Sequence, residues 1–363
     1  MNAMTGALDA MARDAAATPH RGFLDSAAEE RYAQIGSRLK ELDVPVRLRL
    51  ATSVKTNPEP NLLATSRRHG AYAEVISPGE LALALRVGFA ANEIVYNGPF
   101  RCDADRAPAP LAFAFADSIE ALDRYLHDAI AEVPGVRIRP PGIDSRFGVP
   151  AARLDEVARL AREACPKSFA LSFHVRPQEY GGRTWSELAH AVIAAAVHLT
   201  ETMETPIVAF DGGGGWTPDA FDALLDVELP NVARAIGERL PSVRELIIEP
   251  GQAMATPTEA LVTSIIEVRH NHHGRDVVVD ATIALLPKID AYPHRIYAVD
   301  GDETTLLQSG SDRIFGCACL EDDILAYGVT LPASVSEGDR LIIADCGSYD
   351  ASMAFAFAGH ART

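Results

Sequence analysis

The stretch Ser53-Val54-Lys55-Thr56-Asn57-Pro58 ends the first strand-like segment of the chain and begins a pattern that the following residues repeat. In residues 46–51, just before it, apolar side chains alternate with arginine or alanine, which predicts a β-strand with one apolar face. If the alternation continues, Lys55 lies on the same face as Ala51. The Asn-Pro pair then interrupts the strand, so we expect Lys55 to project from the rim of a sheet.

A lysine at the end of a strand has two interpretations. It is rigidly held and partly removed from water, which suits its amine to form an imine with a carbonyl compound. Most lysines in such places, however, are solvated surface charges. The stretch alone favours the surface charge, and the rest of the chain decides between the two.

Helix-like and strand-like segments alternate from about residue 25 onward, which predicts a parallel α/β architecture. The expected helices include Ala27–Leu42, Glu59–His69 and Pro78–Val87. The expected strands after the one that ends at Lys55 are Ala73–Ile76, Ile94–Tyr96, Val136–Ile138, Ala170–Phe173, Ile207–Phe210 and Leu246–Ile248. A closed (β/α)8 barrel needs eight strands. The sequence indicates seven, so the closure of the barrel is an inference and the eighth strand is not identified.

The texture of the sequence changes after about residue 258, where the helices stop. The expected strands there are Val262–His270, Asp276–Ala281, Arg295–Val299, Asp323–Val329 and Arg340–Ala344. The predicted fold is therefore α/β, a parallel (β/α)8 barrel over residues 25–258 followed by a C-terminal β-rich domain over residues 259–363. Residues 1–24 lack a continuous apolar core, and we interpret them as a poorly ordered lead rather than a signal peptide.

Composition excludes several classes of partner. The 363 residues are 48% hydrophobic and carry a formal net charge of −17, which argues against nucleic acid and anionic membranes as partners. No stretch approaches the roughly 18 to 20 apolar residues that span a bilayer. The number of cysteines is odd, and no two of them form a C-x-x-C motif. Both observations favour a protein of the reducing cytoplasm over one held by a disulfide framework. The cysteines are Cys102, Cys165, Cys317, Cys319 and Cys346.

Chemistry-bearing residues recur at the ends of the predicted barrel strands, where active sites of parallel barrels gather. The glycines of Asp211–Gly215 can cradle a phosphate with backbone N–H groups, or form a flexible loop. Glu249, in Glu249-Pro250-Gly251, can keep a pyridine nitrogen protonated, or belong to a simple turn. His174 can stack on a planar cofactor, or serve as a structural hydrogen-bonding group. Arg137 and Lys55 lie in equivalent places.

Two groups in the β-rich domain have similar alternatives. Cys319 at a site entrance can donate a proton, although a small buried hydrophobic role suits it and Cys317 equally well. Asp323 follows four residues after Cys319. The histidines of His270–Gly274 lie between two strand-like segments and end in glycine, so we expect a hairpin tip there and no metal site.

In this order along the chain, these segments resemble the fold-type III pyridoxal-phosphate-dependent decarboxylases, the group of ornithine, arginine and diaminopimelate decarboxylases. The resemblance runs from about Phe23 to Gly359, nearly the whole chain. It rests on the Lys55 stretch, on Glu74-Val75-Ile76-Ser77-Pro78-Gly79-Glu80-Leu81, Asn97-Gly98-Pro99, Ser145-Arg146-Phe147-Gly148, Phe173-His174-Val175, the glycine run, Glu249-Pro250-Gly251, Cys319 with Asp323, and Gly347-Ser348-Tyr349.

The resemblance implies a role for each of these residues. Lys55 holds pyridoxal 5'-phosphate as a Schiff base, and Cys319 protonates the carbanion after carbon dioxide leaves. The other implied cofactor contacts are Glu74, Arg137, His174, Gly213, Gly214, Gly215, Glu249, Gln252 and Tyr349. The implied partners are a small amino-acid-like substrate and a second copy of the chain, because in this family the two subunits of a homodimer share their active sites.

The chain departs from the family pattern in places that bear on the substrate. Gln252 follows Glu249-Pro250-Gly251 where the family carries arginine, and Arg176 stands where it carries glycine. Leu320 follows Cys319, where enzymes of basic amino acids have an acidic residue. An apolar residue there cannot compensate a second ammonium group, which argues against simple diamino acids.

We therefore expect a decarboxylase of an amino acid or amino-acid conjugate, with the siderophore-assembly branch of the family as a precedent. Its substrate contacts are expected among Arg176, Arg295 and Asp323, with Lys288 and His294 as further groups for an acidic substrate. Two alternatives remain open. One is an amino-acid racemase of the same fold, which needs a second base on the opposite cofactor face. The other is a non-catalytic, cofactor-binding regulatory homologue.

Overall fold

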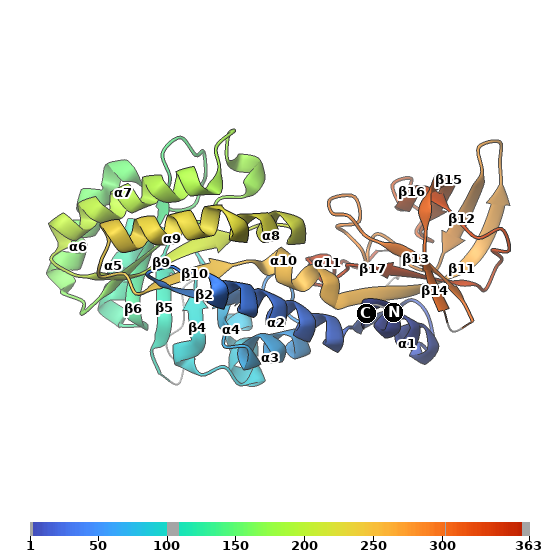
Figure 1. The fold of residues 1–363 in the computed structure, drawn as a ribbon, viewed down its shortest axis with the longest axis horizontal. Helices are drawn as coiled ribbons and strands as arrows, with labels where there is room; N and C mark the ends of the chain where they lie inside the picture. The colour runs from blue at the N-terminus through green and yellow to red at the C-terminus, as the bar shows by residue number, and fades with distance from the viewer. Residues whose placement is uncertain (1–2, 100–108, 302, 358–363) are drawn as a thin grey trace. The chain divides into compact units, whose positions relative to one another are not determined.

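The computed structural model describes residues 3–99, 109–301 and 303–357, and divides into two units (Figure 1). One unit is Tyr32–Ala253, and the other combines Met1–Arg31 with Met254–Thr363. Cys102 lies outside the described residues. None of the helices in the described part of the chain is long and apolar enough to cross a membrane.

The first unit is a closed barrel of eight parallel strands, as the sequence predicted. Its order is β5-β4-β3-β2-β10-β9-β8-β6, and pairing of β5 with β6 closes it. The short strand β7 (Val149–Pro150) extends β6 outside this circle. The barrel strands are β2 (Arg47–Ser53), β3 (Tyr72–Val75), β4 (Ile94–Tyr96), β5 (Leu111–Ala116), β6 (Ala131–Arg139), β8 (Phe169–Ser172), β9 (Ile207–Gly214) and β10 (Glu245–Glu249).

Helices alternate with these strands along the chain (Figure 1). They are α2 (Asp25–Glu41), α3 (Pro60–Arg68), α4 (Pro78–Val87), α5 (Ile119–Asp128), α6 (Leu154–Ala164), α7 (Trp185–Met203), α8 (Pro218–Asp226), α9 (Glu228–Arg239) and α10 (Gly251–Ala255). Several begin with a side-chain cap, such as Thr184, whose hydroxyl accepts from Glu187 N while Glu187 accepts from Thr184 N. Single-turn 3₁₀ helices lie at Ala91–Glu93, Ala151–Arg153 and Pro177–Glu179.

An apolar layer fills the inside of the barrel. Alternate residues of a strand point to the same face, so one set of each strand turns inward. The cluster built on this inward set consists of Ala51, Tyr72, Val95, Phe113, Phe115, Ala170, Ala209 and Ile247, with Val133 and the neighbouring Ala112 packed against them. This layer blocks the interior and leaves the carboxyl ends of the strands as the place for a site.

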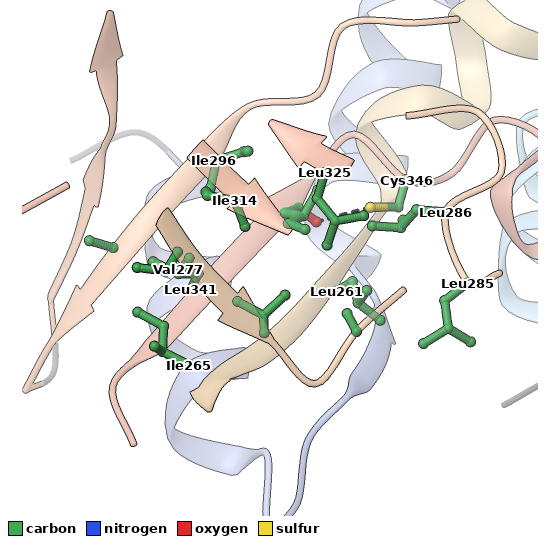
Figure 2. Close-up of a cluster of buried hydrophobic side chains, with 14 of the residues drawn as sticks. Leu261, Ile265, Val277, Leu285, Leu286, Ile296, Ile314, Leu325, Leu341 and Cys346 are labelled. Atoms are coloured by element: carbon green, nitrogen blue, oxygen red, sulfur yellow. Dashed lines mark hydrogen bonds between the residues drawn. The ribbon is translucent and has the colours of Figure 1, made fainter. Parts of the chain in front are cut away.

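The second unit carries a mixed sheet whose order is β14-β13-β17-β11-β12-β15-β16. Its strands are β11 (Glu259–His270), β12 (Arg275–Val279), β13 (Ile296–Asp300), β14 (Glu303–Leu306), β15 (Gln308–Phe315), β16 (Ile324–Thr330) and β17 (Arg340–Ala344). A 3₁₀ turn, Thr256–Thr258, precedes β11, and a short helix, α11 (Asp350–Met353), follows β17. Figure 2 shows the buried side chains between the strands, among them Leu261, Val277, Ile314 and Cys346. The histidine segment is the predicted hairpin tip between β11 and β12.

The N-terminal residues differ from the poorly ordered lead that we expected. Residues Ala3–Asp14 form helix α1, and His20–Phe23 form strand β1, which pairs antiparallel with β11. Leu8 and Ala15 are buried against strand residues such as Val262 and Ile342. The apolar residues of this segment are too scattered to indicate a strand by themselves, and they are ordered by the sheet on which they pack.

Candidate active site

A polar layer lies directly beyond the apolar layer of the barrel. On each barrel strand, an inward position two or four residues further along, at or just past the strand end, carries a polar side chain. These residues are Ser53, Glu74, Asn97, Asp117, Arg137, Ser172, Asp211 and Glu249. The sequence reasoning singled out several of them one by one, and the structure brings them together at one end of one barrel.

Lys55 lies in the turn that follows β2 and points at a buried carboxylate. Its Nζ is 2.6 Å from Glu74 Oε2 and 2.8 Å from Ser53 Oγ, and Ser53 Oγ donates to the same Glu74 oxygen at 2.7 Å. The Glu74 side chain is 1% exposed and that of Lys55 27% exposed, so of the two side chains only Lys55 reaches solvent. Gly251 packs on this turn, because a Cβ there would lie 2.4 Å from Thr56 Oγ1.

Glu249, at the end of β10, is a buried carboxylate with a polar side chain close to each oxygen. Asn97 Nδ2 donates to Oε1, and Oε2 lies 3.3 Å from His174 Nδ1. Burial alone would raise the pKa of Glu249, but the His174 hydrogen bond and the positive charge of Lys55 outweigh burial and lower this pKa to about 2. Glu249 is therefore ionised throughout the physiological range.

His174 follows β8 and faces Glu249 with the edge of its ring. Its Nδ1 lies 3.3 Å from both the Glu249 carboxylate and the backbone N of Gly214. Arg137 fixes the backbone here by donating from Nη2 to the His174 carbonyl oxygen at 2.6 Å. The other end of that guanidinium lies 3.9 Å from Asp117 Oδ1. The structure therefore joins His174, Arg137 and Glu249 in one network.

The glycine run lies largely within β9, which continues to Gly214, so the flexible loop that was one of its two interpretations does not form there. A Cβ on Gly213 would lie 2.6 Å from the Phe173 carbonyl oxygen, and one on Gly214 would lie 1.8 Å from that of Glu249. Gly213 and Gly215 also have positive φ angles of 67° and 108°. Glycine is required here because neighbouring strand ends approach this backbone too closely for any side chain.

Two of the three departures from the family pattern, Gln252 and Arg176, belong to the barrel unit. Gln252 is in α10 and is 7% exposed. Arg176 begins the turn after His174, and its neighbour Pro177 lies against the glycine run, since a Cβ on Gly215 would be 3.2 Å from Pro177 Cδ. The Arg176 guanidinium is 2.5 Å from Glu179 Oε1, and its side chain is 70% exposed.

In the second unit, Cys319 and Asp323 have different environments. Cys319 is an exposed free thiol. Asp323 is buried, and its two oxygens accept the backbone N–H groups of Ile283 and Ala318, both at 2.7 Å. This carboxylate organises the backbone of the turn that carries Cys319, and its expected contact with a substrate stays a prediction. Asp323 also raises the pKa of Cys317, after the larger effect of burial.

Arg295 and His294 are both held by carboxylates of their own unit. Arg295 makes a two-pronged ion pair with Asp345, with N–O distances of 2.6 and 2.7 Å. The His294 side chain is 2% exposed, and its Nε2 lies 2.9 Å from Asp350 Oδ2. His294 is therefore not available to an acidic substrate as we had expected, whereas Arg295 is 45% exposed beside its partner. Tyr349 begins α11 with a positive φ of 66°.

Sequence reasoning missed Ser53, Asp117 and Ser172 as members of the polar layer, and it quoted Asn97 and Asp211 without assigning them a role. The signal was present in the strand periodicity, because each lies two residues beyond an apolar inward position such as Ala51 or Ala209. That signal is recognisable only once the eight strands are known to form one barrel.

Comparison with known proteins identifies the class of enzyme to which this site belongs. The family model described as pyridoxal-dependent decarboxylase, C-terminal sheet domain, matches residues 74–347. Diaminopimelate decarboxylase of Deinococcus radiodurans is 27% identical over 340 residues, which cover 86% of this chain and 82% of that protein. The L-glutamyl-(BtrI acyl-carrier protein) decarboxylase of Niallia circulans is 22% identical over 369 residues, 92% of this chain and 84% of that protein. The solved structure of lysine/ornithine decarboxylase from Vibrio vulnificus, complexed with putrescine, has a TM-score of 0.79 at 19% identity and covers 98% of this chain and 95% of that one.

Fold and family model together define a fold-type III pyridoxal-phosphate enzyme. Within that class, the chain belongs to the family of pyridoxal-dependent ornithine, diaminopimelate and arginine decarboxylases, which are carboxy-lyases.

The residues present fit pyridoxal phosphate. The amine of Lys55 and the ionised, buried carboxylate of Glu249 lie at the same end of the barrel. The amine can react with the aldehyde of pyridoxal phosphate, and the carboxylate can pair with its protonated ring nitrogen. The polar atoms Asn97 Oδ1 and Ser172 Oγ are buried there without a hydrogen-bond partner among the described residues, as expected where a polar ligand binds.

Proposed function

We propose that this chain decarboxylates an amino acid or an amino-acid conjugate, with Lys55 as the anchor of pyridoxal phosphate and Cys319 as the proton donor. The observation that carries the proposal is the pairing of Lys55 with the buried Glu74 at the end of the barrel that also holds the ionised Glu249. When bound, pyridoxal phosphate withdraws electrons from the substrate Cα through its ring, which allows the carboxylate to leave as carbon dioxide.

The barrel residues bind and orient in this proposal. Glu249 holds a proton on the ring nitrogen, and His174 covers the ring and keeps water from it. The backbone of Gly213–Gly215, the hydroxyl of Tyr349 and the amide of Gln252 hold the phosphate. Glu74 and Ser53 fix the amine of Lys55 through hydrogen bonds of 2.6 and 2.8 Å.

The proton that replaces carbon dioxide at Cα comes from the thiol of Cys319. Its exposed position leaves the sulfur accessible to a substrate, and Asp323 fixes the turn on which it lies. We further propose a homodimer in which Cys319 of one subunit serves the barrel of the other. The free thiols Cys165, Cys317, Cys319 and Cys346 fit a cytoplasmic protein.

The substrate in this proposal has no second free ammonium group. Leu320, beside Cys319, is 37% exposed, and an apolar side chain there leaves an ammonium without a partner. An acidic conjugate suits the chain better, because the exposed pair of Arg176 with Glu179 is weak enough for a substrate carboxylate to replace it. The named activity of the Niallia circulans relative, on a glutamyl group carried by another molecule, supports a conjugate. A citrate-linked amino acid of siderophore assembly belongs to the same class.

Carbon dioxide release tests the substrate class. We expect citrate- or acyl-linked amino acids to exceed ornithine, lysine and diaminopimelate in kcat/KM by at least about tenfold, because an unpaired charge is strongly rejected. Higher kcat/KM with the free diamino acids would contradict the proposed substrate.

The proton donor is tested by Cys319→Ala, with Cys317→Ala as the matched control. We expect Cys319→Ala to lower kcat by roughly 10²-fold, the usual contribution of a positioned acid, and to change the product distribution. Cys317, whose Sγ lies 3.3 Å from the Asp280 carbonyl oxygen, should change kcat little. Equal kcat values for Cys319→Ala and wild type would remove Cys319 from the mechanism.

A further inference from the structure

Asp211 is a buried carboxyl in the polar layer for which the proposed mechanism has no use. It is 0% exposed and lies inward at the end of β9. Its Oδ1 accepts the backbone N–H of Gly213 at 2.8 Å. Its Oδ2 is also buried, and no donor reaches it from the described residues. One half of this carboxyl is therefore satisfied and the other half lacks a donor.

The neighbour of Asp211 is a second carboxyl, that of Glu249, and the two side chains interact directly. Both carboxyls are buried on the paired strands β9 and β10, and ionisation of one disfavours ionisation of the other, which favours a proton on one member of the pair. The other carboxylates of the layer have cations of their own, since Glu74 contacts Lys55 and Asp117 lies near Arg137.

The surroundings decide which carboxyl keeps the proton. Asn97 donates to one oxygen of Glu249, His174 Nδ1 lies 3.3 Å from the other, and the charge of Lys55 acts on this carboxylate as well. Asp211 receives a single backbone N–H. The ionised form is better stabilised on Glu249, and the neutral form on Asp211, whose free Oδ2 can then donate.

We propose that Asp211 is held as the neutral acid and keeps its proton while donating a hydrogen bond to the Glu249 carboxylate, which orients that carboxylate and keeps it charged. Burial, followed by the charge of Glu249, raises the pKa of Asp211 well above its ordinary value. Glu74 adds to this effect, and Arg137 on β6 is a cation that interacts with Asp211. Asp211 is a positioning residue, and its importance for catalysis rests on the proposed role of Glu249.

Infrared spectroscopy of the full-length protein at pH 9 tests for the proton directly. The carbonyl stretch of a neutral carboxylic acid is separate from carboxylate bands and shifts on deuteration. We expect such a band in the wild type at a pH where ordinary carboxyls are ionised, and we expect Asp211→Asn to remove it. A wild-type protein without any neutral-acid band at pH 9 overturns the proposal, whether or not the variant folds. A band that persists in folded Asp211→Asn overturns it as well.

Two variants of similar size test the positioning role. Asp211→Asn keeps an N–H donor toward Glu249 and an acceptor for Gly213, whereas Asp211→Leu removes both. We expect kcat/KM of Asp211→Asn within about threefold of wild type and a loss of roughly 10- to 100-fold for Asp211→Leu, the usual effect of a lost hydrogen bond to a charged group. An equal loss in the two variants would mean that Asp211 acts through its charge, which contradicts the proposal.

These outcomes are separate from the fate of the proposed function. A neutral-acid band in a protein that never couples pyridoxal phosphate to Lys55 would support Asp211 and reject the anchor. Coupling without the band would reject the proton on Asp211 alone.

Discussion

Glu80 is the residue whose titration we expect to change the free energy of unfolding near neutral pH. It lies in the first turn of α4, where its Oε2 accepts the N–H of Ile76 at 2.8 Å. Burial, with a further contribution from Glu74, raises its pKa to about 7, although Lys55 opposes the shift. The unfolded chain loses this proton near its ordinary value of 4.5. Between about pH 4.5 and 7 the folded state therefore holds more protons, and stability from this group falls as the pH rises.

We predict that Glu80→Gln removes this loss, because glutamine keeps the acceptor for Ile76 and cannot ionise. A shift of this size corresponds to at most about 3 kcal/mol, and partial exposure reduces it to roughly 1–2 kcal/mol. Denaturant unfolding at pH 4.5 and 8 measures the difference, with exposed Glu41→Gln as the control for one lost charge. A parallel pH dependence in wild type and Glu80→Gln would show that Glu80 does not titrate in this range.

Single residues also show where sequence reasoning stopped. Lys55, His174 and Glu249 were selected because each follows an apolar strand, and the structure places them at one barrel end. Asp211 was quoted only as the start of a glycine run. Its interest comes from burial beside Glu249, and burial of a particular polar atom depends on strand packing that no local pattern contains.

Strand β9 is the element on which the site depends most closely. We predict that Gly214→Ala is destabilised by about 3 kcal/mol or more and loses the cofactor, because the new Cβ would lie 1.8 Å from the Glu249 carbonyl oxygen. Gly36→Ala in α2, with no atom within 4 Å of its Cβ, is the matched control and should be stabilised by about 0.5–1 kcal/mol. Thermal unfolding measures both, and equal melting temperatures for Gly214→Ala and wild type would contradict the close approach.

Most barrel strands were predictable from the sequence, and one was not. The segments Ile94–Tyr96 and Pro78–Val87 match β4 and α4 residue for residue. Strand β5, Leu-Ala-Phe-Ala-Phe-Ala over Leu111–Ala116, was not counted, although all six residues are buried. It lacks the polar alternation of a half-exposed strand, because a parallel barrel covers both of its faces. Strands β14 and β15 were missed for the opposite reason, since three of four residues in β14 and four of eight in β15 are exposed.

At the scale of the whole molecule, the proposed homodimer predicts how defects combine. A heterodimer of Lys55→Ala with Cys319→Ala subunits, isolated with two different tags, has one intact site if the sites are shared. A heterodimer of wild type with the Lys55→Ala/Cys319→Ala double variant then has none. We predict about half of wild-type activity for the first and almost none for the second. The reverse result would mean that each chain completes its own site.

The domain pattern of the molecule was predictable in outline but not at its N-terminus. The change from helices to strands near residue 258 falls close to the start of the second unit at Met254. The pairing of β1 with β11 joins residues more than two hundred positions apart, and no local signal predicts such a contact.

The most direct test of the central claim is borohydride reduction of the purified protein with pyridoxal phosphate, followed by peptide mass analysis. We predict a visible absorption band that disappears on reduction, and a pyridoxyl mass increase on the peptide that contains Lys55. Lys40, Lys167 and Lys288 are internal controls and should remain unmodified. A stable adduct on one of these three lysines in place of Lys55, or no adduct on any lysine of the chain, would contradict the role of Lys55 and the site built around it.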